Sequence, residues 1–269
     1  MSPFWWFWGK IESKYKINNS NKCYVVLGFP RSGTSLISRL VSCCGVSFGN
    51  PKKFKQADWR NPKGFYEYSE IIKLDEKLVS QAGLTSSHRF GGGINLRAKG
   101  ILNRIKRIFT RRRMILVLNE ISSSGKKWGL KEFPSTFYFW ETYIPQCKII
   151  AIYREPVSNS YSVRNSFKRH TYRQIIEQWT ASNKELLYHV STKDSIVIKL
   201  EDLSDKEKQK NILRKLTEFI GSGSVNELEK LIEPFVSKSD KHIKNLKQNY
   251  PLDDDARMVL KILDDIKLD

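Results

Sequence analysis

Four short apolar runs, each followed by a segment with helical spacing, form the main pattern of the chain. The runs read CYVVLGF, WGLKEF, CKIIAIYRE and SIVIKLEDL, and they begin at residues 23, 128, 147 and 195. They are too short for typical helices and are rich in β-branched and aromatic residues, so each run predicts a buried strand. Strands that alternate with helices favour a parallel sheet covered on both faces. The pattern therefore predicts an α/β fold of three layers, with a central parallel sheet flanked by helices.

The predicted helices follow from apolar residues spaced three and four apart. In the longest of them, Ile175, Trp179 and Leu186 would form the buried side. The expected helices cover 34–44, about 67–83, 134–145, 156–167 and 172–191, and the part from Ser204 to the end is expected to be helical. We see no repeat and no linker, so residues 23–269 are predicted to form a single domain after an aromatic and basic segment, 1–22.

A basic segment follows the most glycine-rich stretch, which contains Gly91, Gly92 and Gly93. Within KGILNRIKRIFTRRRMILVLNEI, four apolar residues fall at helical spacing among arginines and lysines: Ile101, Ile105, Ile108 and Phe109. One interpretation is a solvated basic face above a buried stripe. The other is a binding surface for an acidic acceptor or an anionic lipid. The pattern leaves both open, and the glycines with the basic segment could frame an acceptor cleft.

Charge and cysteine usage narrow the partners and the compartment. The chain has 47 Lys and Arg against 28 Asp and Glu, a net charge of +19, which favours acidic partners without choosing among them. The four cysteines show no paired metal-ligand spacing, so we expect no metal and a reducing, cytoplasmic setting. The aromatic run FWWFW is too short for a signal peptide or a membrane span. It predicts either a flap packed on the domain or a peripheral contact at the inner face of the membrane.

The first predicted strand ends in GFPRSGTS, which fits a phosphate-binding loop except that Thr34 stands in the lysine position. The N–H groups of Ser32, Gly33, Thr34 and Ser35 are expected to converge on an anion at a helix N-terminus. Arg31 would add charge from within the loop. In nucleoside triphosphatases the loop lysine reaches the β- and γ-phosphates. A ligand without a γ-phosphate would need it less.

The third predicted strand ends in YREPVSNSYS. Arg154 closes the strand, Pro156 suits the first turn of a helix, and Ser162 lies on that helix. An arginine and a hydroxyl placed in this way can hold one phosphate from two sides. The alternative is an arginine that pairs with a surface carboxylate.

Together the two loops resemble the cofactor loops of sulfotransferases that use 3′-phosphoadenosine 5′-phosphosulfate (PAPS). In that family the first loop holds the 5′-phosphosulfate, and an R-x-P-(x)5-S element, matched by Arg154, Pro156 and Ser162, holds the 3′-phosphate. NPKGFYE, WGLKEFPS, VIKLEDL and LTEFIG are similar to further family segments, so the resemblance runs from about Cys23 to Gly221. The chain departs from the family pattern in three ways. Lys131 is followed by Glu-Phe-Pro, Leu200 replaces a tyrosine, and the membrane anchor of Golgi members is missing, so no Golgi role is expected.

The resemblance implies a P-loop-like fold and transfer of a sulfuryl group from PAPS to an acceptor hydroxyl or amine, with a saccharide or glycolipid as the expected acceptor. Arg31 and Lys131 would stabilise the charge that develops, and no metal is required. Glu67 is the first candidate for the base, although it could also be a carboxylate that stabilises a helix start. Weaker candidates for the base are Asp58, His88 and Glu120.

Two rival functions remain at this stage. One is a P-loop kinase of a small molecule, for which SIVIKLED could supply a magnesium ligand. The absent loop lysine argues against this rival. The other is a basic module that binds nucleic acid or membrane. That module would explain the charge but neither loop, so nucleic acid is not an expected partner.

Overall fold

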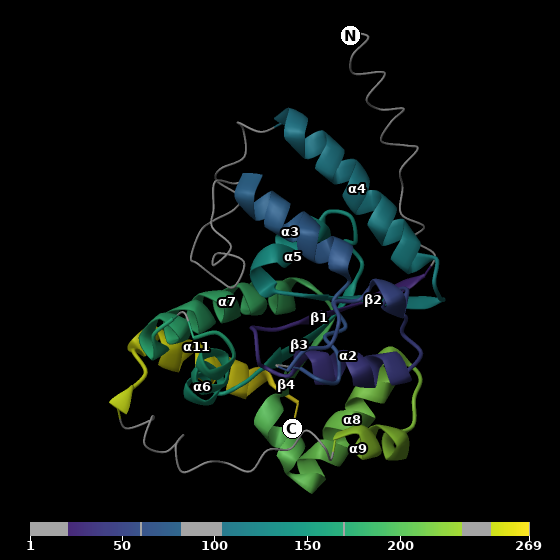
Figure 1. Cartoon of the computed structure of the whole chain (residues 1–269). Helices are drawn as coiled ribbons and strands as arrows, with labels where there is room; N and C mark the ends of the chain where they lie inside the picture. Colours follow the sequence, from purple (N-terminus) through teal and green to yellow (C-terminus); the bar gives the residue numbers. More distant parts are fainter. Residues whose placement is uncertain (1–20, 60, 82–103, 169, 233–248, 269) are drawn as a thin grey trace, which may run out of the picture.

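The core of the protein is a parallel sheet of four strands (Figure 1). The computed structural model describes residues 21–59, 61–81, 104–168, 170–232 and 249–268, without the side chains of 104–109. The strands are β1 (Lys22–Leu27), β2 (Lys127–Glu132), β3 (Lys148–Tyr153) and β4 (Ser195–Lys199), in the order β2-β1-β3-β4. All three pairings are parallel, as the apolar runs predict. The carboxyl ends of the four strands therefore lie along one edge of the sheet.

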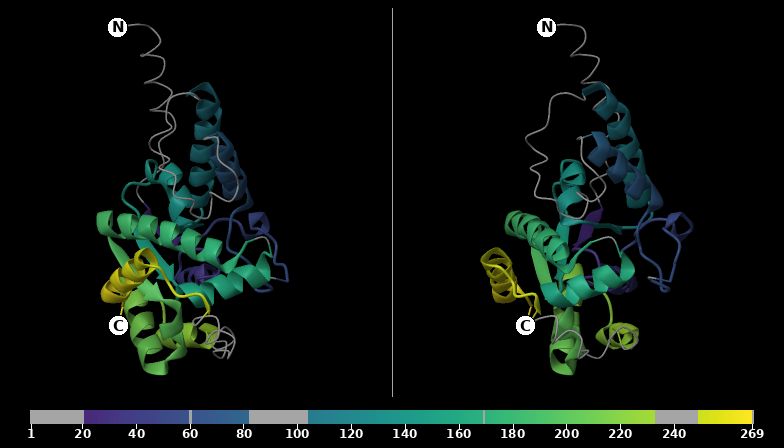
Figure 2. Two further views of the ribbon diagram at one scale, coloured as in Figure 1. Left: turned by 90° about the vertical axis from the view of Figure 1, so that its left-hand side faces the viewer. Right: turned by 60° about the vertical axis from the view of Figure 1, so that its left-hand side comes forward.

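Helices cover both faces of this sheet (Figures 1 and 2). One face packs against α2 (Thr34–Cys43), α8 (Lys206–Ile220) and α9 (Val225–Ile232). The other packs against α3 (Ser69–Gln81), α4 (Arg104–Ser122), α5 (Pro134–Glu141), α7 (Tyr172–Thr192) and α11 (Asp254–Ile266), while α6 (Pro156–Ser166) lies against α7. Along β1, Val25 and Leu27 enter one core, and Tyr24 and Val26 enter the other. The three-layer α/β prediction is confirmed.

Where the structure describes the chain, the helix predictions are confirmed in type, with small shifts at their ends; residues 82–83 and 233–248 of the predicted helical parts lie outside the described residues. Ile175, Trp179 and Leu186 are fully buried, as their spacing predicts. Helix α3 begins at Ser69 rather than near Glu67. The strand prediction for the fourth apolar run is wrong beyond Lys199, where β4 ends. The rest of that run belongs to the short 3-10 helix η3 (Leu200–Ser204).

Helix α4 contains most of the basic segment and runs beside α3 (Figure 1). Met114, Val117, Leu118 and Ile121 are buried on its inner side. Arg111, Arg112 and Arg113 are exposed. Ile101 and the side chains of Ile105, Ile108 and Phe109 lie outside the described residues, as do His88, Gly91–Gly93 and the segment 1–20.

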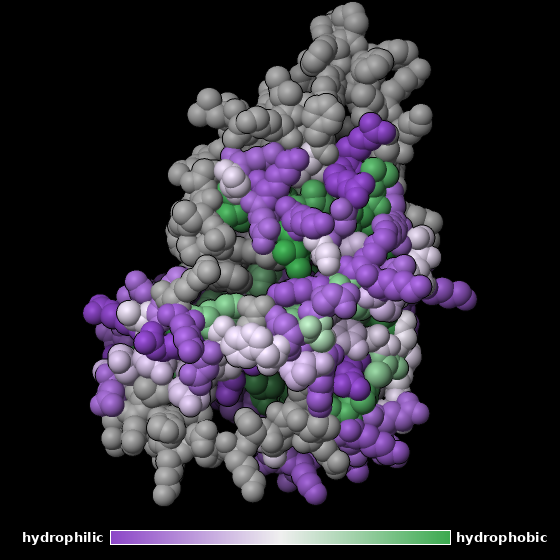
Figure 3. Space-filling model, in the orientation of Figure 1, coloured by the Kyte–Doolittle hydropathy of each residue, from purple (hydrophilic) through white to green (hydrophobic). Residues whose placement is uncertain are grey.

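The described surface agrees with a strongly charged chain. On the face drawn in Figure 3, hydrophilic side chains predominate, and hydrophobic ones form separate patches. Of the helices within the described ranges, none combines the length and the apolar character required to span a membrane.

Candidate functional site

The loop between β1 and α2 has the backbone shape of an anion site. Arg31 and Gly33 both adopt left-handed conformations, with φ of 66° and 93°. For a non-glycine residue such strain costs roughly 1–3 kcal/mol and persists only where the surroundings impose it. Among the described residues, no side-chain hydrogen bond caps α2, and its first helical hydrogen bond runs from Ile37 N to Gly33 O at 3.1 Å. The earlier amides of α2 therefore point out of the helix, where they and the helix dipole favour a negative ligand.

Two glycines let this loop lie directly on the sheet. A Cβ atom at Gly28 would be 2.5 Å from the carbonyl oxygen of Ile152 in β3. A Cβ atom at Gly33 would be 2.6 Å from Cδ1 of Leu200. Leu200, which stands where the resembling family has tyrosine, therefore packs against the loop itself. At Gly28 a side chain would collide with sheet backbone, and at Gly33 it would require a strained φ of 93° and a shift of the Leu200 side chain.

Asn159 on α6 holds the same loop through two hydrogen bonds. Its amide Nδ2 donates to Pro30 O at 3.1 Å and to Ser32 Oγ at 3.0 Å. Ser32 is fully buried, and its N–H donates to Phe29 O at 3.2 Å. We expected the Ser32 amide to point at the anion, but it is engaged within the loop. Ser32 and Asn159 shape the site, and sequence analysis missed Asn159 because only its buried position on α6 distinguishes it from the other polar residues there.

Lys131, at the end of β2, contacts two other segments, the start of α2 and the stretch 65–67. Its ammonium donates to Ser35 Oγ at 2.9 Å, to Phe65 O at 2.7 Å and to Glu67 Oε1 at 3.0 Å. These three acceptors match the three protons of an ammonium group. The predicted site residues Ser35, Glu67 and Lys131 are thus brought together. Asn61 adds a further contact, because its Nδ2 donates to Ser35 Oγ at 3.0 Å.

The pair of Lys131 and Glu67 lies largely out of solvent, with side chains 5% and 14% exposed. Burial lowers the pKa of Lys131, and the nearby Glu67 carboxylate partly offsets that effect. Lys55 lies on the other side of Glu67, with Nζ 3.6 Å from Oε2. Two cations therefore lie against the Glu67 carboxylate.

Arg154 directly follows β3 and lies at the same edge of the sheet. Its side chain is 18% exposed, and Nε is 3.7 Å from Glu201 Oε1. Burial lowers the pKa of Arg154 and raises that of Glu201. Within the described part of the chain, Nε is buried and has no hydrogen-bond partner. An arginine held in this way retains a donor for an incoming anion.

The N-terminus of α6 is occupied by a side chain of the protein. Glu155 accepts from Val157 N at 3.2 Å and from Ser158 N at 2.8 Å. The Glu155 N–H in turn donates to Glu201 Oε1 at 3.2 Å. An anion near α6 would therefore meet the side chains of Arg154 and Ser162 rather than free helix amides.

Ser162 connects the two predicted loops. Its hydroxyl oxygen accepts a hydrogen bond of 3.2 Å from Arg31 Nε. The alternative for Arg154, a carboxylate partner, is also present in the form of Glu201. The two predicted anion-binding loops are thus neighbours at one edge of the sheet.

The weaker base candidates lie in other surroundings. Asp58 accepts from Asn61 N at 3.3 Å in a turn. Glu120 accepts from Lys53 and from the Tyr68 hydroxyl, and these hydrogen bonds lower its pKa. Among the described candidates, only Glu67 contacts Lys131 and lies beside the first loop.

Comparisons with known proteins address the fold. A scan against protein-family models and a search of curated protein sequences each find no match. Among solved structures, the chain is similar to the sulfotransferase domain of the Synechococcus PCC 7002 olefin synthase. That match has a TM-score of 0.51 and 15% identity and covers 93% of this chain and 97% of that domain.

Two further similar structures are also sulfotransferases. One is STF1 from Mycobacterium tuberculosis, with a TM-score of 0.49, 12% identity and coverage of 91% of this chain and 80% of STF1. The other is mouse SULT7A1 in complex with PAP, with a TM-score of 0.44, 14% identity and coverage of 95% and 85%. The parallel sheet with helices on both faces, and its match to the olefin synthase domain over nearly the whole of both chains, show that this protein has the sulfotransferase fold.

Proposed function

We propose that this protein is a PAPS-dependent sulfotransferase. The observation that carries the proposal is the contact between Arg31 and Ser162, which makes one continuous site of two anion-binding loops. PAPS has a phosphosulfate on one side of its ribose and a phosphate on the other, so it needs two such sites. Because PAPS has no γ-phosphate, having Thr34 in place of the loop lysine removes no contact that PAPS requires.

In the proposed arrangement the first loop binds the 5′-phosphosulfate. The amides of Gly33, Thr34 and Ser35 and the guanidinium of Arg31 would hold it, while Arg154 and Ser162 would hold the 3′-phosphate. The resemblance to PAPS-dependent sulfotransferases implies this division. The uncapped start of α2 and the unpartnered Nε of Arg154, both judged within the described part of the chain, support an anion site at each loop. The proposed chemistry is positional and electrostatic and uses no metal ion.

Glu67 is the proposed base. It would take the proton from the acceptor hydroxyl or amine, whose oxygen or nitrogen then bonds to sulfur. The bond from sulfur to the 5′-phosphate oxygen breaks, and 3′,5′-ADP leaves with the charge. Lys131, which contacts the proposed base, and Arg31, which contacts Ser162, would stabilise charge around the transferring group.

The acceptor we propose is a saccharide or a glycolipid, and the setting we propose is the cytoplasm. The excess of positive charge favours an acidic acceptor. Four free cysteines suit a reducing compartment. A peripheral membrane contact stays a prediction that rests on the aromatic N-terminal segment alone.

Thermal unfolding with different ligands tests the function, because a ligand of the native state raises the unfolding midpoint. We expect 3′,5′-ADP to raise the midpoint, and we expect ATP with Mg²⁺, DNA and anionic vesicles to raise it less. Stabilisation by ATP with Mg²⁺ alone would favour the kinase, and stabilisation by DNA or vesicles alone would favour the binding module. Labelled PAPS incubated with a host extract would then reveal the acceptor.

A further inference from the structure

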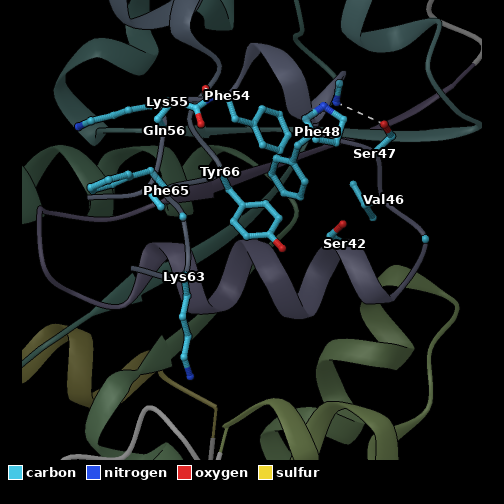
Figure 4. A pocket seen from close by; sticks show the side chains of 15 residues that line it. Ser42, Val46, Ser47, Phe48, Phe54, Lys55, Gln56, Lys63, Phe65 and Tyr66 are labelled. Carbon is cyan, nitrogen blue, oxygen red and sulfur yellow. Dashed lines mark hydrogen bonds between the residues drawn. The ribbon is translucent and has the colours of Figure 1, made fainter. Parts of the chain in front are cut away.

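A cavity of about 650 Å³ opens next to the proposed base, between α2 and the chain segment 46–66 (Figure 4). Its size is within the range of pockets that bind small molecules. Four aromatic residues dominate its lining: Phe48, Phe54, Phe65 and Tyr66. The last two directly precede Glu67 in the chain, so the cavity and the proposed base share one stretch of backbone.

Tyr66 joins the cavity to the proposed base, because its side chain lines the cavity and the next residue is Glu67. Tyr66 has a left-handed conformation with φ of 54°, and its ring lies over α2 (Figure 4). The ring centroid is 6.1 Å from that of Phe48 and 5.8 Å from that of Phe54. Glu67 reaches Lys131 instead. Strain of this kind in a non-glycine residue indicates that the surroundings impose the backbone shape. Here the surroundings are the aromatic side chains of the cavity and the ion pair of Glu67 with Lys131.

The charge of the cavity is positive. Lys55 and Lys63 line it, and no Asp or Glu stands among its described lining residues. The Lys55 ammonium lies 4.1 Å from the centre of the Phe65 ring and also 3.6 Å from Glu67 Oε2. Lys55 therefore borders the cavity and also pairs with the proposed base.

Resting on the proposed function, we propose that this cavity binds a ring-bearing, negatively charged part of the acceptor while an acceptor hydroxyl reaches Glu67. Aromatic walls favour a planar apolar group, and Lys55 and Lys63 favour a carboxylate or similar anion. The acceptor class is then an acidic glycoside with an aryl or other apolar aglycone, rather than a free sugar.

Three commercial glycosides separate these features. The probe is 4-nitrophenyl β-D-glucuronide, and methyl β-D-glucuronide and 4-nitrophenyl β-D-glucoside lack its ring and its charge respectively. Binding is measured by saturation-transfer difference NMR with saturating 3′,5′-ADP present, so no turnover is required. We expect the probe to bind about tenfold or more tightly than either analogue. Equal affinity for all three compounds would overturn the proposal.

Two substitutions locate the binding in this cavity. Ser42→Trp fills it from α2, and Lys63→Glu reverses the charge on an exposed lining residue. Each substitution should lower the affinity for the probe about tenfold or more. The matched control, Lys261→Glu on the exposed side of α11, should leave its affinity unchanged. If the tryptophan variant does not fold, the lysine variant decides.

The two proposals fail in different ways. If 3′,5′-ADP still raises the unfolding midpoint but neither cavity variant weakens the probe, the cavity proposal is wrong and the donor site stands. If 3′,5′-ADP has no effect on the native protein, the proposed function is wrong whatever the glycosides do.

Discussion

Arg154→Ala separates the two ends of the proposed donor. In the structure the guanidinium is mostly buried beside Glu201, and Nε has no hydrogen-bond partner among the described residues. A lost hydrogen bond to a charged group costs about 1.5–3 kcal/mol. At 1.4 kcal/mol for each factor of ten, affinity for 3′,5′-ADP should fall about 10- to 150-fold. Affinity for 5′-AMP, which lacks the 3′-phosphate, should change little.

The assay is calorimetric titration of both nucleotides into the wild-type protein and the variant. Arg173→Ala on α7 is the matched control, since that side chain is 86% exposed and pairs only at the surface with Glu177. If Arg154→Ala keeps the wild-type ratio of the two affinities, Arg154 does not read the 3′-phosphate and the reasoning fails.

A structural effect of the same substitution can be separated from the binding effect. Removing Arg154 leaves the Glu201 carboxylate without the opposite charge that now offsets its burial. The variant should therefore unfold at a lower temperature. Adding Glu201→Gln should restore much of that stability without restoring affinity for 3′,5′-ADP. Recovery of affinity in the double variant would mean that the first loss was only structural.

Three more substitutions test the rest of the site. Glu67→Gln should lower turnover about 10²–10⁴-fold with affinity for 3′,5′-ADP intact, and a near-normal rate would remove Glu67 as the base. Because burial lowers the pKa of Lys131, kcat should decline on the alkaline side below the ordinary lysine value of about 10.4, and Lys131→Arg should move that decline to higher pH. If the alkaline decline of kcat stays at the same pH in Lys131→Arg, Lys131 is not its cause. Gly33→Ala forces an alanine into φ of 93° and against Leu200, so it should cost about 1–2 kcal/mol of stability or more and weaken 3′,5′-ADP. The control Gly221→Ala, also left-handed but with open space around it, should lose stability and keep that affinity.

The edge of the sheet that holds the site was predictable from the sequence. Apolar runs with intervening helices predict parallel strands, and parallel strands bring their carboxyl ends to one edge. Lys131 lies at the carboxyl end of one strand, and Arg31 and Arg154 follow two others, so their proximity to one edge required no knowledge of contacts. The fold and the place of the site are therefore encoded in local periodicity.

The partners of these residues were not predictable in the same way. Asn159 reaches Ser32 across 127 positions of the chain, and Lys131 reaches Glu67 across 64. Left-handed backbone is expected of glycine, but no local signal marks it at Arg31 or Tyr66. Such features arise from packing between elements, and periodicity within one element does not contain them.

The pairing of charges at the candidate site would connect the proposed donor binding to the proposed catalysis. Lys131 pairs with Glu67, and Arg154 lies beside Glu201, so each of these cations already has a carboxylate neighbour before any ligand binds. A phosphosulfate that drew Lys131 toward itself would weaken the hydrogen bond to Glu67. A carboxylate that loses a cationic neighbour holds a proton more readily and is therefore a stronger base. We therefore expect that Glu67 becomes fully active only after the donor is bound, which would protect the acceptor site from unproductive proton transfer.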